Sequence, residues 1–507
     1  MAKKKKFVNN RGPVSTIIIL TAVMAILSLI LSMIGFQGNK TYIGTDSLET
    51  SLVVVKNIIS LDGIKYIIGN IVTNFISFKP LSVMIISLIG IGILEKSGLM
   101  YAIFNKFKNI KFEIIIFFTV FAGVISSFIG DYSYMLLMPF VAIMYKYLNR
   151  NPIFGIITVF IGITLGYGAN LIFTYDDYQL GKLTELAANL DVDPTFKYNL
   201  FSNIYIMIFT TLLLTFIATI TIKKYLFPKY PKKIIIENEE QTVSKKGLFL
   251  TNVAFIVLLL FVIYMILDIK MPGAGILLDN NSSDYMSKLF GSASPFREGL
   301  IFIITSIMMV LGFIYGKISN NIKNSHEYSL GLSKNFENLG LMFVLMFFTS
   351  IMVSILDYTN IGVVISANLV DFISSISLSG TLLIIIFMFV VIIMSILIPD
   401  TYTKWQLLSP TVVPLFMRAN ITPSFVQFAF RIADGIGKSI TPFFIYLIIM
   451  IAFLEKYNVD EKRKISIAGT LKTLMPVILI LSLTLILIVV LWYIIGIPIG
   501  IGTNVTI

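Results

Sequence analysis

The sequence lacks cysteine altogether and contains a single histidine, His326. The absence of cysteine excludes disulfides, thiolate metal sites and cysteine nucleophiles. His326 lies in a polar stretch, residues 319–335, where we expect a solvated surface side chain. No zinc-binding motif is present, and no apolar stretch offers a histidine base. We therefore expect neither an enzyme nor a bound cofactor.

Charged residues are also scarce, at 13% of the 507 residues, whereas soluble domains contain about a quarter. Hydrophobic residues make up 57%, and the mean hydropathy is +0.90. These values indicate an integral membrane protein with many spans. The formal net charge is +12, but lysine and arginine cluster in short loops between apolar runs. Such loops orient membrane proteins, so we expect the lipid bilayer, not nucleic acid, as the partner.

Nine long apolar segments predict membrane-spanning helices. The first is too long for the apolar core of a signal peptide, and the lysines before it, Lys3 to Lys6, place the N-terminus in the cytoplasm. An odd number of spans then places the C-terminus outside a cell inner membrane. The nine segments are residues 13–36, 80–100, 152–171, 200–222, 248–269, 300–315, 339–356, 425–454 and 474–495, with an interfacial helix expected around 64–78.

Two further apolar stretches are interrupted by polar residues and predict re-entrant hairpins. Residues 114–147 are broken at 130–134, and residues 378–416 are broken at 399–405. Basic residues flank both ends of the first stretch, so both ends lie on the inner side, while the second enters from outside. The expected fold is an all-α membrane protein with nine transmembrane helices and two opposed hairpins, similar to the ion-transporter superfamily.

An internal repeat relates the two hairpins. Asp131 precedes Gly166 by 35 residues, and Asp400 precedes Gly435 by the same interval. The pairs Gly166/Gly168 and Gly435/Gly437 share the offset of 269 residues that separates the two aspartates. We therefore divide the single membrane domain, 1–507, into two repeats: 112–190 (hairpin 112–150, broken helix 152–190) and 378–457 (hairpin 378–418, broken helix 422–457).

Five crossings separate the hairpins, so the second repeat is inverted relative to the first. Inverted repeats with discontinuous helices are typical of secondary transporters, whose substrate site lies near the membrane midplane between the breaks. We accordingly place the substrate and ion path at the hairpin tips, Asp131 and Asp400, and at the two breaks.

The second break is expected at Gly435 and Gly437, followed by Pro442, within an otherwise apolar run. Gln427, Arg431 and Asp434, spaced by four and three residues, share one face of the preceding helix. Arg431 offers planar donors to a carboxylate, and Asp434 is placed to accept a proton or a cation. The alternative is an internal ion pair between Arg431 and Asp434.

Beyond this break, backbone N–H groups from Thr441 onward, together with Lys438, favour an anionic substrate group. At the second hairpin tip, Tyr402 and Trp405 are candidates for stacking on an aromatic ligand; the alternative is a packing role. Just past the first break, Asp177 is a better candidate for a proton or cation site than Asp176, although a solvated helix end is the alternative. A sodium ion near Asn170 or Asp434 is a further possibility.

Several short motifs together resemble the p-aminobenzoyl-glutamate transporter (AbgT) family. They are found at residues 90–98 (GIGILEKSG), 151–152 (NP), 166–170 (GYGAN), 404–405 (KW), 430–434 (FRIAD), 440–442 (ITP), 469–471 (GTL) and 492–498 (WYIIGIP). The resemblance implies a homodimer of nine-span subunits with two opposed hairpins. It also implies a transport path lined by Asp177, Trp405, Pro423, Arg431, Asp434 and Pro442.

This chain departs from the family pattern at two places. Residues 400–403 read Asp-Thr-Tyr-Thr, where the family has a run of serine and alanine. Residues 434–438 read Asp-Gly-Ile-Gly-Lys, where the family has Asp-Ser-Val-Thr-Asn. Lys438 therefore adds a fixed cation, which either stands in for a coupling sodium ion or pairs with Asp434.

The expected function is secondary active transport of a small aromatic or anionic solute. The resemblance implies p-aminobenzoyl-glutamate or related folate-catabolite and sulfonamide compounds, driven by a proton or sodium gradient. The alternatives are a sodium-coupled carboxylate carrier or antiporter and, because residues 164–168 are similar to a potassium-channel filter, an ion channel.

Overall fold

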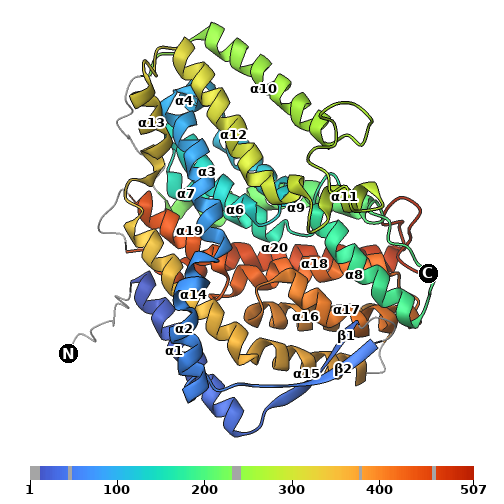
Figure 1. Cartoon of the computed structure of the whole chain (residues 1–507). Helices are drawn as coiled ribbons and strands as arrows, with labels where there is room; N and C mark the ends of the chain where they lie inside the picture. The colour runs from blue at the N-terminus through green and yellow to red at the C-terminus, as the bar shows by residue number, and fades with distance from the viewer. Residues whose placement is uncertain (1–11, 44–47, 231–240, 376–378, 459–463) are drawn as a thin grey trace.

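A computed structural model describes residues 12–43, 48–230, 241–375, 379–458 and 464–507. The lysines used to orient the N-terminus, Lys3 to Lys6, lie outside these ranges, as does residue 378, where the second predicted repeat begins. The described chain is mostly helical (Figure 1). Its apolar helices confirm the expected class of helical membrane protein.

In the described ranges, nine segments are long and apolar enough to cross a membrane. They include α5 and α16, the first limbs of the two predicted hairpins, whereas α7 is too short at 14 residues. Helices α18 and α19 are long and apolar enough only when taken together, and they are bent by 45° at the break between them. The nine are α1 (Pro13–Met33), α2 with α3 (Leu61–Lys96), α5 with η2 (Phe112–Ile129), α9 with η3 (Ile204–Lys229), α10 (Lys245–Ile266), α12 (Pro295–Ile318), α14 (Gly340–Thr359), α16 (Gly380–Leu397) and α20 (Ile467–Ile495).

Each predicted hairpin has a helical limb on either side of a short polar turn. The first consists of α5 (Phe112–Ile125), η2 (Ser126–Ile129) and α6 (Tyr132–Tyr147). The second joins α16 to α17 (Thr401–Arg418). Asp400 ends this turn and is the N-cap residue of α17, because its Oδ2 accepts a 2.7 Å hydrogen bond from the Thr403 N–H. Asp131 and Asp400 therefore lie at the two tips.

The first broken helix has its interruption where the sequence predicts it. Helix α7 (Pro152–Leu165) ends at Gly166, and α8 (Tyr175–Asp191) begins after an irregular segment. The Thr174 hydroxyl and the Asp177 carboxylate form a capping box that starts α8. Every residue of α7 is buried, and its apolar side chains from Ile153 to Leu165 belong to the main hydrophobic core.

The predicted break at Gly435 and Gly437 is wrong, because α18 (Pro423–Ile440) runs continuously through both glycines. Their role is close packing: a Cβ on Gly435 would lie 2.6 Å from the Thr164 carbonyl oxygen, and one on Gly437 would lie 2.5 Å from Ser395 Cβ. The helix ends instead at Thr441, which is extended because Pro442 follows it. After the break, α19 (Ile445–Lys456) continues in a new direction.

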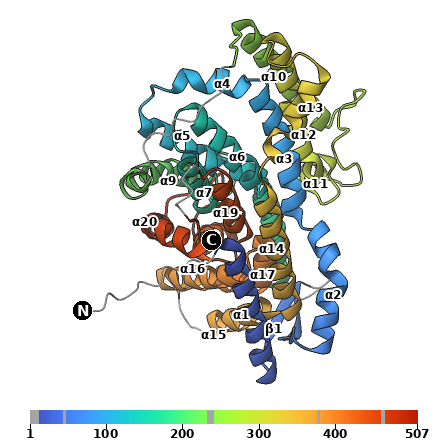
Figure 2. The ribbon, with the colours of Figure 1, turned by 90° about the vertical axis from the view of Figure 1, so that its left-hand side faces the viewer.

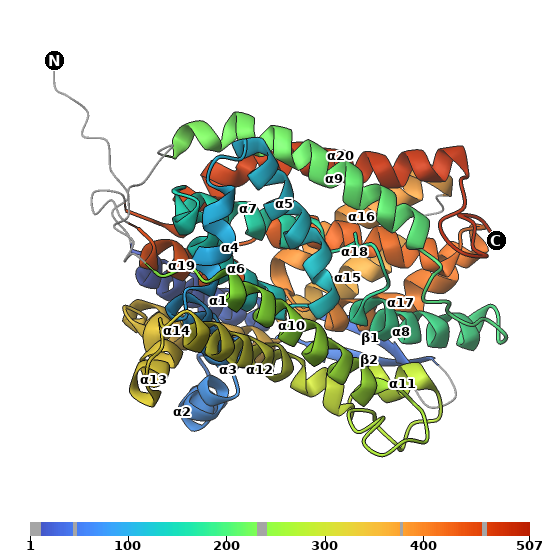
Figure 3. The same cartoon turned by 90° about the horizontal axis from the view of Figure 1, so that it is seen from above.

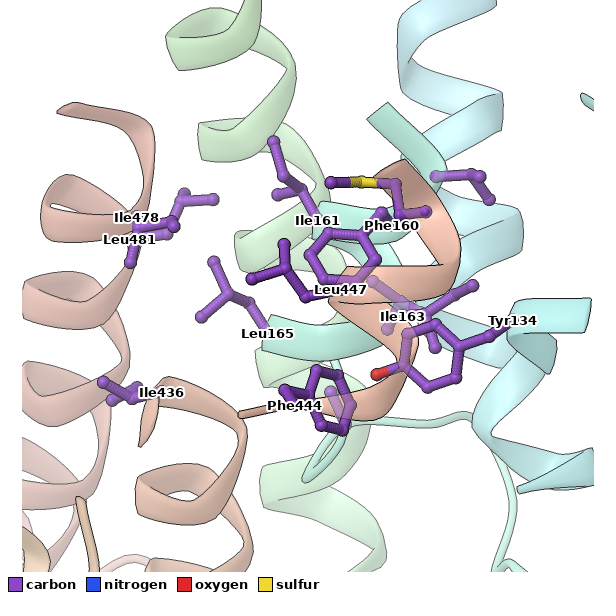
Figure 4. Packing of buried hydrophobic residues seen from close by; sticks show 14 of the residues in the cluster. Tyr134, Phe160, Ile161, Ile163, Leu165, Ile436, Phe444, Leu447, Ile478 and Leu481 are labelled. Atoms are coloured by element: carbon purple, nitrogen blue, oxygen red, sulfur yellow. The ribbon is translucent and has the colours of Figure 1, made fainter. Parts of the chain in front are cut away.

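The two broken helices therefore cross with their backbones in close contact. A Cβ on Gly168 would lie 2.6 Å from Ile432 Cδ1 of α18. Figure 4 shows Phe160 and Leu165 of α7 beside Leu447 of α19 and Phe444, which immediately precedes α19, all within one hydrophobic cluster. This crossing fixes the first break against the middle of α18.

The segment before α3 contains a β-hairpin that the sequence reading missed. Strands β1 (Gln37–Ile43) and β2 (Leu48–Val54) pair antiparallel, with Gln37 opposite Val54, and β1 packs on α15 (Ile361–Ser375) and α17. The predicted interfacial helix is α2 (Leu61–Ile76), and it leads directly into α3 (Lys79–Lys96). A row of exposed apolar side chains along α2 suits contact with lipid: Leu61, Ile64, Ile68, Val72 and Ile76.

The remaining helices surround this centre. Helix α10 packs along α12 at one edge of the molecule (Figures 1 and 2), and its buried residues are only Gly247 and Thr251. Figure 3 shows α9 and α20 along one side and α12 and α13 along the other. The short elements are α4 (Leu99–Phe104), η1 (Asn105–Phe107), η3 (Phe227–Lys229), α11 (Tyr285–Phe290), α13 (Ser325–Ser333) and η4 (Lys334–Phe336).

Candidate functional site

Two adjoining cavities, of about 300 and 390 Å³, lie where the hairpin tips meet. Both are lined by Lys79, Asp131, Asp400 and Tyr446, so each cavity touches both tips and the start of α19. The sequence predicted Asp131 and Asp400 for this place. It did not single out Lys79 or Tyr446, although a tyrosine within the apolar run of α19 was a visible signal.

The first cavity combines aromatic rings with charges of both signs. Its acidic residues are Asp131, Asp176 and Asp400, and its basic residues are Lys79 and Arg297. Arg297 stacks over Tyr175, with the guanidinium carbon 4.4 Å from the ring centroid. The aromatic residues in the wall are Tyr132, Tyr167, Tyr175, Tyr402, Tyr446, Phe128, Phe290 and Phe296. Such a lining suits a ligand that has an aromatic ring and charged or polar groups.

A buried ion pair joins α18 to the first break. Arg431 and Asp177 are each 1% exposed, and Arg431 Nη1 donates to Asp177 Oδ1. Arg431 Nη2 donates to the Tyr167 carbonyl oxygen at 2.8 Å. Asp177 Oδ2 accepts hydrogen bonds of 2.7 Å from both the backbone and the hydroxyl of Thr174. The expected alternative, an Arg431 pair with Asp434, is therefore wrong.

Asp434 instead shares its carboxylate between two lysines. Oδ1 contacts Lys404 Nζ and accepts a 2.8 Å hydrogen bond from the Ser395 hydroxyl. Oδ2 lies 3.1 Å from Lys438 Nζ and accepts from the Thr401 hydroxyl at 2.5 Å. Pairing with Asp434 was one of the two expectations for Lys438. Lys404 was not predicted as a site residue, although a lysine within the apolar stretch 378–416 indicates a buried charge that needs a partner.

We call Lys404, Asp434 and Lys438 the lysine cluster. Lys404 and Asp434 are fully buried, and Lys438 is 4% exposed. Lys438 Nζ donates to the Thr401 hydroxyl and lies 4.5 Å from the centroid of the Tyr167 ring. Because Thr401 and Tyr167 both line the first cavity, the cluster lies directly behind the cavity wall.

Trp405 does not face either cavity, so the expectation that it stacks on a ligand is wrong. Its side chain is fully buried, and Nε1 donates to the Leu180 carbonyl and the Thr184 hydroxyl. Its ring packs on Phe430, with centroids 4.6 Å apart. The packing alternative therefore holds for Trp405, whereas Tyr402 lines the first cavity. Gln427 belongs to the same polar group, because its Oε1 accepts from Thr184 at 2.6 Å.

Other predicted path residues hold the backbone in place. Asn170 Nδ2 donates to the Ser127 hydroxyl at 2.8 Å and fastens the first break to the first hairpin. Thr441 donates to the Ile396 carbonyl at 2.9 Å and fastens the second break to α16. Pro423 starts α18 and lines neither cavity, while Pro442 ends the helix.

The described residues contain no group of three or more histidine, cysteine or acidic side chains able to hold a metal ion. At Asp434 both carboxylate oxygens contact ammonium groups, Oδ1 that of Lys404 and Oδ2 that of Lys438. At Asn170 the amide oxygen accepts from the Leu171 N–H at 2.7 Å.

Paired hairpin tips, two broken helices in contact and a polar, aromatic cavity between them define a membrane solute transporter. Residues 9–507 match the model of the "AbgT putative transporter family". The chain belongs to this family and is a multi-pass membrane transporter, as its motifs implied.

Three known proteins are similar to this chain. The p-aminobenzoyl-glutamate transport protein of Escherichia coli is 26% identical over 97% of this chain and 93% of its own length. The structure of the Alcanivorax borkumensis YdaH transporter is 23% identical, with a TM-score of 0.49, and covers 97% of this chain and 100% of its own. The Neisseria gonorrhoeae MtrF structure, from a class described as antimetabolite efflux pumps, is 25% identical, with a TM-score of 0.49 and 97% coverage of both chains.

Proposed function

We propose that this transporter moves a small aromatic, anionic solute, p-aminobenzoyl-glutamate or a related folate-catabolite or sulfonamide compound, driven by a proton or sodium gradient. The observation that carries the proposal is the first cavity, whose wall combines tyrosine and phenylalanine rings with Lys79 and Arg297. The rings pack on the aromatic part of the solute, and the two cations attract its carboxylates. The name of the Escherichia coli relative supports this class of solute.

The architecture suits alternating access. In our proposal residues 112–190 and 378–457 form the two inverted repeats, and the hairpin tips open the cavity to one side of the membrane at a time. The Arg431–Asp177 pair and the crossing of α7 with α18 keep the wall fixed as the tips move. We also propose a homodimer in the inner membrane, with a cytoplasmic N-terminus and an external C-terminus. The lysines around η1, Lys106, Lys108 and Lys111, support this orientation.

Uptake of radiolabelled p-aminobenzoyl-glutamate into proteoliposomes tests the proposal. We expect saturable uptake that exceeds equilibrium under an imposed ion gradient and stops when the gradient is collapsed. Arg297→Gln removes a cation from the cavity and should raise KM roughly ten- to hundredfold, the cost of a hydrogen bond to a charged group. Lys288→Gln is the matched control, because Lys288 pairs with Asp268 away from the cavity.

A flux that does not saturate and ignores every gradient would establish a channel and contradict the proposal. An unchanged KM for Arg297→Gln would instead remove Arg297 from the solute site.

A further inference from the structure

The lysine cluster contains one positive charge too many. Two ammonium groups share the single carboxylate of Asp434, and the three side chains are at most 5% exposed. A buried charge without a counter-charge is costly in a membrane protein. The arrangement therefore favours a cluster that gives up one proton when conditions allow.

The surroundings offset this excess only in part. Arg431 and Asp177 already form a pair of their own, and the neighbouring Ser395 and Thr401 are uncharged. The other titratable groups nearest the cluster and the cavity include Asp131, Asp176, Asp400, Tyr134, Tyr167, Tyr175, Tyr402 and Tyr446. Asp131 and Asp400 line the cavity near enough to attract Lys438, but among the described residues neither forms an ion pair with the cluster.

A hydroxyl connects the cluster to the cavity. Lys438 Nζ donates to Thr401 Oγ1, and this hydroxyl also donates to Asp434 Oδ2. Thr401 itself lines the first cavity. If the Thr401 hydroxyl rotates from Asp434 toward the cavity, it can accept a proton from Lys438 and pass its own to cavity water, with no rearrangement of the helices.

We propose that the lysine cluster is the proton-binding site that couples transport to a proton gradient. The step is a simple acid–base exchange: one N–H bond of an ammonium group breaks, the proton passes to cavity water, and a neutral amine remains. The proton belongs to the cluster as a whole, because either lysine can pair with Asp434. The inference rests on the proposed function and adds its coupling ion.

Sodium is excluded from this site by the same charges. Both oxygens of Asp434 are engaged, Oδ1 by Lys404 and Ser395 and Oδ2 by Lys438 and Thr401. A sodium ion would either displace one of the two ammonium groups or raise the net positive charge of the cluster from one to two. An anionic solute in the cavity, in contrast, favours the protonated cluster, so solute and proton bind together.

The test compares Lys404→Met and Lys438→Met with the unchanged protein in proteoliposomes. Each variant leaves one lysine paired with Asp434, so the excess charge disappears. We expect both to exchange p-aminobenzoyl-glutamate across the membrane without a gradient, but to lose accumulation under a proton gradient. A pH indicator in weakly buffered detergent solution should show proton uptake on solute binding in the unchanged protein and none in the variants.

Lys146→Met is the matched control. Glu95 is also shared by two lysines, Lys146 at 3.3 Å and Lys334 at 3.6 Å, but these are 25% and 27% exposed. Accumulation by this variant should equal that of the unchanged protein. Accumulation by Lys438→Met under a proton gradient, or accumulation by the unchanged protein under a sodium gradient alone, would overturn the proton site while leaving the proposed function intact. Absence of both exchange and accumulation in the unchanged protein would overturn both.

Discussion

Arg431→Met is expected to abolish solute transport and to lower the free energy of unfolding by about 3–5 kcal/mol. The substitution leaves the Asp177 carboxylate buried without its counter-charge and removes the donor to the Tyr167 carbonyl. It also removes the contacts that join α18 to residues 166–177 at the first break, so the adjoining wall of the cavity becomes less stable. Uptake in proteoliposomes and thermal unfolding in detergent, followed by tryptophan fluorescence, measure the two effects.

Two further variants separate the charge from the packing. Arg431→Met combined with Asp177→Asn removes both charges and should recover most of the stability while transport remains absent. Arg418→Met breaks the exposed pair with Asp191 and should cost less than about 1 kcal/mol. Normal transport by Arg431→Met would show that the pair is dispensable.

Asp434→Asn is expected to have the second large effect, a loss of transport together with about 3–5 kcal/mol of stability. It leaves two ammonium groups side by side in a buried site with no carboxylate between them. The repulsion disturbs the packing of α17 against α18. The same fluorescence and uptake measurements apply.

Removing the lysines as well tests this cause. Asp434→Asn with Lys404→Met and Lys438→Met contains no charge in the cluster and should regain stability without regaining transport. Glu95→Gln leaves Lys146 and Lys334 without their carboxylate, but both lysines are partly exposed to water. This substitution should therefore change the free energy of unfolding by less than about 1 kcal/mol. Equal losses for Asp434→Asn and Glu95→Gln would contradict the role of burial.

The parts of the fold that the sequence predicted depend on local signals. Polar residues in an apolar run mark the hairpin tips at Asp131 and Asp400, and glycine marks the first break at Gly166. Such residues make a helix through lipid less favourable at their own position. They can therefore be recognised from the sequence without knowing which segments pack against them. The break before Pro442 also has a local cause, because proline lacks the N–H that would continue α18.

The parts that could not be predicted depend on contacts between distant segments. Gly435 meets Thr164, and Arg431 meets Asp177, only after the two broken helices have crossed. The spacing of Arg431 and Asp434 puts them on one face of α18, but their closest charged partners lie on other helices. Arg431 pairs with Asp177 of α8, and Asp434 pairs with Lys404 of α17. Trp405 likewise finds its hydrogen-bond partners on α8, which no spacing along the chain indicates.

The most direct test of the account is whether solute occupies the cavity between the hairpin tips. The chain has no cysteine, so a thiol introduced by Gln179→Cys, in the wall of the first cavity, is the sole target for a maleimide. We predict that p-aminobenzoyl-glutamate at ten times its Kd slows labelling roughly tenfold, in proportion to the free fraction, and leaves labelling of Ser329→Cys on exposed α13 unchanged. Labelling of Gln179→Cys at the same rate with and without saturating solute would contradict the account.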